Sequence, residues 1–163
     1  MVALRARSFA AELRGWIVMV AAATLHAFST ELLVGSMTFS VLATMLCLGE
    51  SFMQKFGANI LRSLDSAAYF SAIFSLCCIP IVALTGNAAG DASSSPYLVN
   101  KMLLSGLCLG LWIGVIHGRY TLGPELWQNR KMSIFHAVLV GLGYGTAAML
   151  GSIGSLMTRG ETV

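Results

Sequence analysis

The stretch LHAFSTELLVG, residues 25–35, decides how many helices this chain contains. It places His26 and Glu31 in the middle of a long apolar region, residues 16–48. If that region is one helix, the polar pair lies inside a single span. If the chain turns at the polar pair, the region forms two spans connected by a hairpin.

The composition of the whole chain is that of a membrane protein. Of the 163 residues, 56% are hydrophobic and 10% are charged, whereas soluble domains carry about 25% charged residues. The uncharged runs approach or exceed the roughly 20 residues with which a helix crosses a bilayer, and the period-two alternation of a membrane barrel is absent. The sequence predicts an all-α fold, a polytopic transmembrane bundle of four to five helices.

We expect one membrane domain over residues 1–163. An Arg-rich, amphipathic segment, residues 1–15, precedes the first apolar run and is interpreted as a retained start before a signal anchor. The spans are expected near residues 16–30, 32–50, 66–86, 101–118 and 134–157. So little chain remains between them that no soluble catalytic domain fits, and the scattered basic residues give no support for nucleic-acid binding.

The basic residues favour the hairpin model. Lys and Arg in short loops prefer the cytoplasmic or matrix side of a membrane. A single span would place Lys55, Arg62 and Arg119 opposite the N-terminal arginines, whereas a hairpin at residues 26–31 places them all on one side. We therefore expect five segments, with the polar pair near the outer face. A variant has the short first segment entering obliquely, which leaves a four-helix core.

Small residues recur at helical spacing in the last two spans. Four glycines follow one another at intervals of four residues, and two more occupy the next span: Gly106, Gly110, Gly114, Gly118, Gly141 and Gly145. Stripes of this kind allow close helix approach in membranes. We expect these two helices to pack along the two stripes.

Two histidines are candidates for binding a b-type haem. His117 ends one span and His136 begins the next, so both are expected at the same membrane level. Paired imidazoles are haem ligands, and nearby cations such as Arg119 suit the propionates. His26 is a third candidate ligand, with no identified partner. The alternative is that these histidines are interfacial residues that bond loop carbonyls or lipid headgroups.

Glu31 is the carboxylate inside the long apolar region, and with His26 across a turn it is a candidate for proton relay or quinone binding. The alternative is that the pair simply hydrates a hairpin. We expect no metal site, because no metal-binding motif occurs. No catalytic set converges in the sequence either, so the chain is not expected to be catalytic on its own.

Several stretches from His26 onward resemble a bacterial family of small four-helix membrane domains of unknown function, some of them fused to Rieske-type iron–sulfur domains. The resemblance is carried by LHAFSTELLVGSMTFSVLATML, by SAAYFSAIFSLCCIPIVALTG, by the span with His117 and by the closing GSIGSLMTRGETV. The family's first helix opens with His-Pro and a second His, whereas Ala27 and Glu31 stand at those positions here. The resemblance implies a redox role and a His26 and His117 pair.

Two functions remain open on the sequence. The first is a mainly structural accessory subunit of a larger respiratory or photosynthetic-type electron-transfer complex, in a bacterial or mitochondrial inner membrane. The second is an electron carrier with a b-type haem on His117 and His136 that exchanges electrons with quinone. Both predict the lipid bilayer, bound lipids and other membrane subunits as partners.

Overall fold

The computed structural model describes residues 2–89 and 98–159, with side chains for residues 12–49, 57, 59–86 and 98–154. This part of the chain forms four α-helices and one short 3-10 helix: α1 (Val2–Leu48), α2 (Glu50–Ala89), α3 (Leu98–Leu122), η2 (Gly123–Trp127) and α4 (Arg130–Arg159). Each α-helix is long and apolar enough to cross a membrane. The all-α prediction is confirmed, with four long helices.

Helix α1 runs through the stretch that was expected to turn, so the predicted hairpin at residues 26–31 is wrong. The hydroxyl groups of Ser29 and Thr30 donate to the His26 carbonyl at 3.1 and 2.7 Å, inside the helix. Glu31 is exposed. No glycine or proline interrupts residues 16–34, so nothing breaks the backbone ladder. The spans expected at 16–30 and 32–50 are two parts of one helix.

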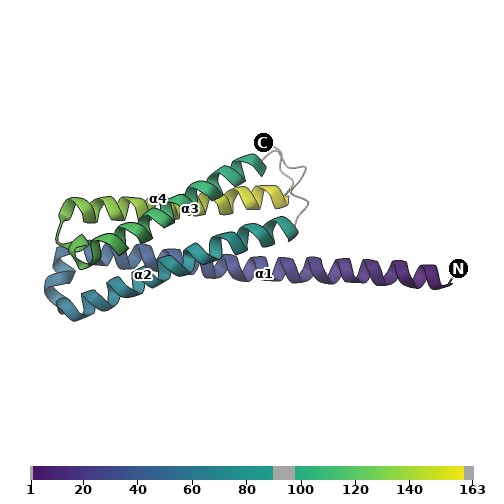
Figure 1. Cartoon of the computed structure of the whole chain (residues 1–163), viewed down its shortest axis with the longest axis horizontal. Helices are drawn as coiled ribbons and strands as arrows, with labels where there is room; N and C mark the ends of the chain where they lie inside the picture. The colour runs from purple at the N-terminus through teal and green to yellow at the C-terminus, as the bar shows by residue number, and fades with distance from the viewer. Residues whose placement is uncertain (1, 90–97, 160–163) are drawn as a thin grey trace.

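The chain reverses direction after α1 at a glycine. Gly57 has φ 78° and ψ 163°, which interrupts the helical geometry within α2. Positive φ values of this kind are accessible to glycine because it has no Cβ. Beyond this break α2 returns antiparallel along α1 (Figure 1).

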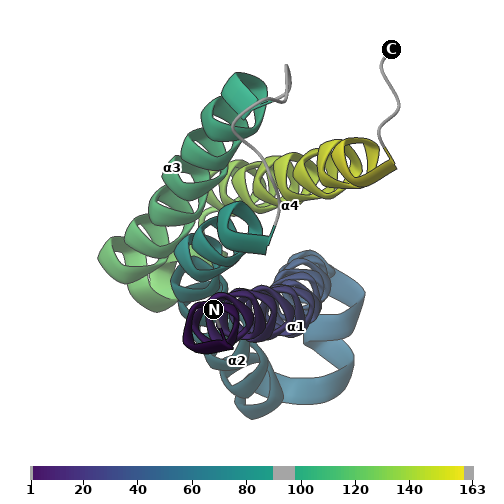
Figure 2. The same cartoon turned by 90° about the vertical axis from the view of Figure 1, so that its right-hand side faces the viewer.

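The four helices form a bundle with two unlike ends. The α1–α2 and α3–α4 connections close one end, whereas the N-terminus and the ends of α2 and α4 lie toward the other (Figure 1). Viewed along the bundle, α1 lies beside α2 and α3 crosses beside α4 (Figure 2). Helix α1 continues far beyond the other three helices at the open end (Figure 1).

Apolar side chains fill the inside of the bundle and also cover its outside. The core is built around Met37, Trp112 and Val140, which are fully buried. On the outer surface Phe70 and Leu103 expose about two thirds of their area, at 67% and 68%. A water-soluble helix presents a polar face to solvent, so this bundle has the surface of a protein surrounded by lipid.

Helices α3 and α4 pack against each other, but not along the expected stripes. A Cβ built on any of the six stripe glycines would meet no atom of another helix within 4 Å. The close approach occurs instead at Gly143, where a Cβ would lie 3.0 Å from Nε1 of Trp112. The Cys108 thiol also approaches the Gly143 carbonyl, at 3.7 Å. A glycine outside the stripes therefore makes room for Trp112, the largest fully buried side chain of the described residues.

This contact predicts a position-specific effect of alanine on stability. Gly143→Ala is expected to lower the free energy of unfolding by about 1–3 kcal/mol, because the fully buried indole of Trp112 would have to shift away from the new methyl group. Thermal or denaturant unfolding in detergent measures the change. Gly141→Ala and Gly145→Ala are matched controls on the same helix, and open space there predicts no loss. Equal stability of all three variants would contradict the packing.

Candidate functional site

The strongest polar cluster in the described residues lies at the closed end of the bundle. The Asp65 carboxylate, on α2, is 6% exposed. It accepts hydrogen bonds from Nε of Arg119, on α3, at 2.7 Å, and from Nε1 of Trp127, on η2, at 2.7 Å. Nη2 of Arg119 donates to the second carboxylate oxygen and completes a two-point ion pair. One acidic side chain therefore connects three segments.

The connection between α3 and α4 positions the side chain of Trp127. Gly123 has φ 53°, which lets the chain leave α3, and Pro124 lies in the first turn of η2. Ser133 then ties this turn to α4, because its hydroxyl donates to the Leu126 carbonyl at 2.6 Å. Asn129 caps α4 by accepting from the Lys131 backbone amide at 3.1 Å. The indole of Trp127 is held against Asp65 as a result.

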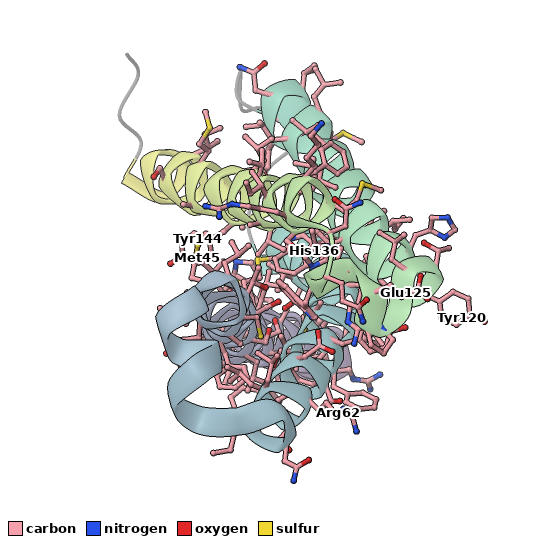
Figure 3. All side chains as sticks on the ribbon, turned by 90° about the vertical axis from the view of Figure 1, so that its left-hand side faces the viewer. Met45, Arg62, Tyr120, Glu125, His136 and Tyr144 are labelled. Carbon is pink, nitrogen blue, oxygen red and sulfur yellow. The ribbon has the colours of Figure 1, made fainter. Side chains whose placement is uncertain are left out.

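His136 completes this cluster from α4. It is 6% exposed, and its ring meets Trp127 edge to face, with 6.0 Å between ring centroids and 86° between planes. The view of the side chains shows His136 in the middle of the bundle, whereas Tyr120 and Glu125 lie at its outer edge (Figure 3). His136 therefore faces the bundle interior.

A small cavity of about 10 Å³ lies within this cluster, and we call it the polar chamber. Side chains from all four helices and η2 line it: Ser40, Thr44, Asp65, Ala68, Tyr69, Ala72, Val115, Arg119, Trp127 and His136. Asp65 and Arg119 carry opposite charges, so the chamber is close to neutral. It is far too small for a haem or a quinone ring.

A second polar contact lies toward the open end of the bundle. Nδ1 of His26, on α1, is 3.1 Å from the Val82 carbonyl and 3.2 Å from Oγ1 of Thr85, both on α2. The carbonyl only accepts, so this nitrogen donates to it. A Cβ on Gly86 would lie 2.8 Å from Cε1 of the ring. His26 therefore packs against Val82, Thr85 and Gly86 of α2, a contact that requires a glycine and holds α1 against α2. We call this site the His26 socket.

The structure separates the three histidines that were candidates for haem ligation. His117 is exposed on α3, whereas His136 is buried in the polar chamber. His26 is level with Val82, which lies 17 residues along α2 from Asp65, or about 25 Å at the helical rise. Neither the His117 and His136 pair nor the His26 and His117 pair faces a common space.

Glu31 and His26 also fail to converge. Both lie on the continuous α1, and five residues of helix turn their side chains to different sides. Glu31 is exposed and His26 is engaged with α2. The geometry gives no support to a shared proton or quinone site on this pair.

Sequence reasoning did not single out Asp65 or Thr44, and it considered Arg119 only as a loop cation and as a possible partner of haem propionates. The sequence nonetheless contains an indication that Asp65 and Arg119 could pair. Asp65 immediately precedes the uncharged run 66–90, and Arg119 immediately follows the uncharged run 102–118. Opposite charges at matched ends of adjacent antiparallel spans are candidates for pairing, because an unpaired charge in a membrane is costly.

No protein-family model, curated protein or solved structure matches this chain.

The three-segment connection at Asp65 predicts a large stability effect. Asp65→Asn is expected to cost about 3–5 kcal/mol, because it leaves the half-buried Arg119 charge without its counterion. The double variant Asp65→Leu with Arg119→Met is expected to recover most of the loss, since it removes both charges together. Unfolding in detergent measures both. Arg62→Met, at an exposed position one turn earlier, is the control, and an Asp65→Asn variant as stable as this control would contradict the pairing.

Proposed function

We propose that this chain is an integral membrane subunit that holds its place in a larger membrane assembly, with a mainly structural role. The observation that carries this proposal is the part of α1 that extends beyond the bundle. We call residues 12–25 the α1 extension.

The α1 extension is apolar on all sides for most of its length. Trp16, Ile17, Val18 and Met19 follow one another and are exposed by 63%, 55%, 66% and 47%. Because four consecutive residues cover a full turn of an α-helix, no side of this turn is polar. A helix that rests on a membrane surface has one polar face, which this turn lacks.

The bundle itself already matches the thickness of a bilayer. The uncharged part of α2 at residues 66–86 is about 30 Å long at the helical rise, and the hydrocarbon core of a bilayer is also about 30 Å thick. His26 is level with the end of this stretch. Trp16 lies ten residues earlier on α1, about 15 Å farther out. A bilayer aligned with the bundle therefore leaves the α1 extension uncovered.

The exposed surface of the α1 extension indicates which kind of partner would cover it. A single neighbouring helix, such as that of a second copy, covers one side of the α1 extension and leaves the others in contact with water. An apolar surface on all sides requires a groove or several helices around it. We infer that the partner is a larger membrane protein with an apolar groove that continues beyond the hydrocarbon core.

The proposed host is a respiratory or photosynthetic-type electron-transfer complex of a bacterial or mitochondrial inner membrane. This part of the proposal rests on the sequence resemblance and on the histidines alone. The packing favours the structural role within such a complex over the haem carrier, because the chamber around His136 is only about 10 Å³.

Photo-crosslinking in the native membrane tests the partner. A benzoylphenylalanine placed at each of positions 16, 17, 18 and 19 in turn is expected to crosslink to the same partner polypeptide, because the groove surrounds the helix. Positions 70 and 103, on the outer surface of the bundle, serve as controls and are expected to give lipid adducts. Lipid adducts alone from positions 16–19 would overturn the proposal, as would crosslinks only to a second copy.

A visible difference spectrum tests the alternative function. The purified chain is expected to show no b-type band in the reduced-minus-oxidised spectrum, because His117 and His136 do not share a space. A band that disappears in both His117→Ala and His136→Ala would contradict this expectation. It would show that the two histidines bind one haem together.

A further inference from the structure

Two polar side chains that line the polar chamber make no hydrogen bond to another of the described residues. Thr44, on α1, is 1% exposed, and His136, on α4, is 6% exposed. Asp65 and Ser40 beside them are engaged, because Asp65 accepts from Arg119 and Trp127 and Ser40 donates to the Ala68 carbonyl at 3.3 Å. Buried polar groups are nearly always hydrogen-bonded, and an unpartnered one is costly.

Thr44 and His136 line the same small space. The chamber has a volume of about 10 Å³, close to the minimum of about 10–15 Å³ that one water molecule needs. A buried water commonly makes about three hydrogen bonds to polar groups that lack other partners. The Thr44 hydroxyl and the His136 ring nitrogens provide two such groups, and an Asp65 oxygen has a further lone pair for a third.

The charge of the chamber distinguishes water from an ion. An anion would need a free cation, but both Nε and Nη2 of Arg119 donate to Asp65. A cation would need a free carboxylate, and Asp65 already accepts from three donors. A neutral molecule that both donates and accepts fits this balance of groups.

We propose that the polar chamber holds one ordered water molecule that bridges Thr44 and His136 beside the Asp65 carboxylate. This water connects α1 and α4 to the cluster that Asp65 forms with α3 and η2. All four helices then meet in one hydrogen-bonded network at the closed end of the bundle.

The decisive measurement is an experimental structure of the full-length chain, at a resolution that shows ordered waters. Density for a single water within hydrogen-bond distance of Thr44 and His136 is expected. An empty chamber would overturn the proposal. Crystals soaked in bromide test for an anion, and an anomalous peak in the chamber would overturn the proposal in favour of an ion site.

Two variants of Thr44 provide a second test. Thr44→Val keeps the shape and removes the hydroxyl, so the water loses a partner and the melting temperature is expected to fall by about 2–4 °C. Thr44→Ser keeps the hydroxyl and is the control, in which the chamber density persists. A Thr44→Val variant that melts at or above the temperature of the Thr44→Ser control, with unchanged density, would contradict the bridging role.

Discussion

A carboxylate inside an apolar bundle needs compensation, and the closed end of this molecule is organised around that need. Asp65 receives donors from α3 and η2, and the aromatic ring that approaches it also packs against His136 of α4. The short 3-10 turn therefore has a defined place, although it connects two helices through only a few residues. A further bond joins η2 to α4, because the Ser133 hydroxyl donates to the Leu126 carbonyl.

Hydrogen bonds and an ion pair fix how the helices of this bundle are rotated against one another. When apolar side chains face both the core and the surroundings, burial alone does not decide which face of a helix turns inward. Polar contacts settle that choice in this chain. The Asp65 cluster sets the rotation of α2 and α3 at one end, and the His26 socket sets the rotation of α1 against α2 toward the other. Between them, the Ser36 and Ser75 hydroxyls meet at 2.7 Å.

The all-helical fold could be predicted from the sequence, but the number of helices could not. Spans near 66–86, 101–118 and 134–157 follow from apolar length alone. The hairpin in α1 was predicted from charge placement, and with four helices the ten basic residues divide evenly between the two ends. One of them, Arg119, is neutralised by Asp65 and gives no orientation signal. The candidate site was harder still, because the pairing of Asp65 with Arg119 depends on which helices become neighbours, and the glycine stripes suggested the wrong faces.

The length of α1 bears on how the cell handles copies of this chain that have not yet assembled. A newly made copy carries an apolar α1 extension that its own bundle does not cover, and under the proposed function this extension stays uncovered until the chain assembles with its partner. Quality-control proteases and chaperones act on such exposed apolar segments. Under the proposed function, the abundance of this protein would follow the supply of the partner that covers α1 rather than its own rate of synthesis, and unassembled copies would not accumulate.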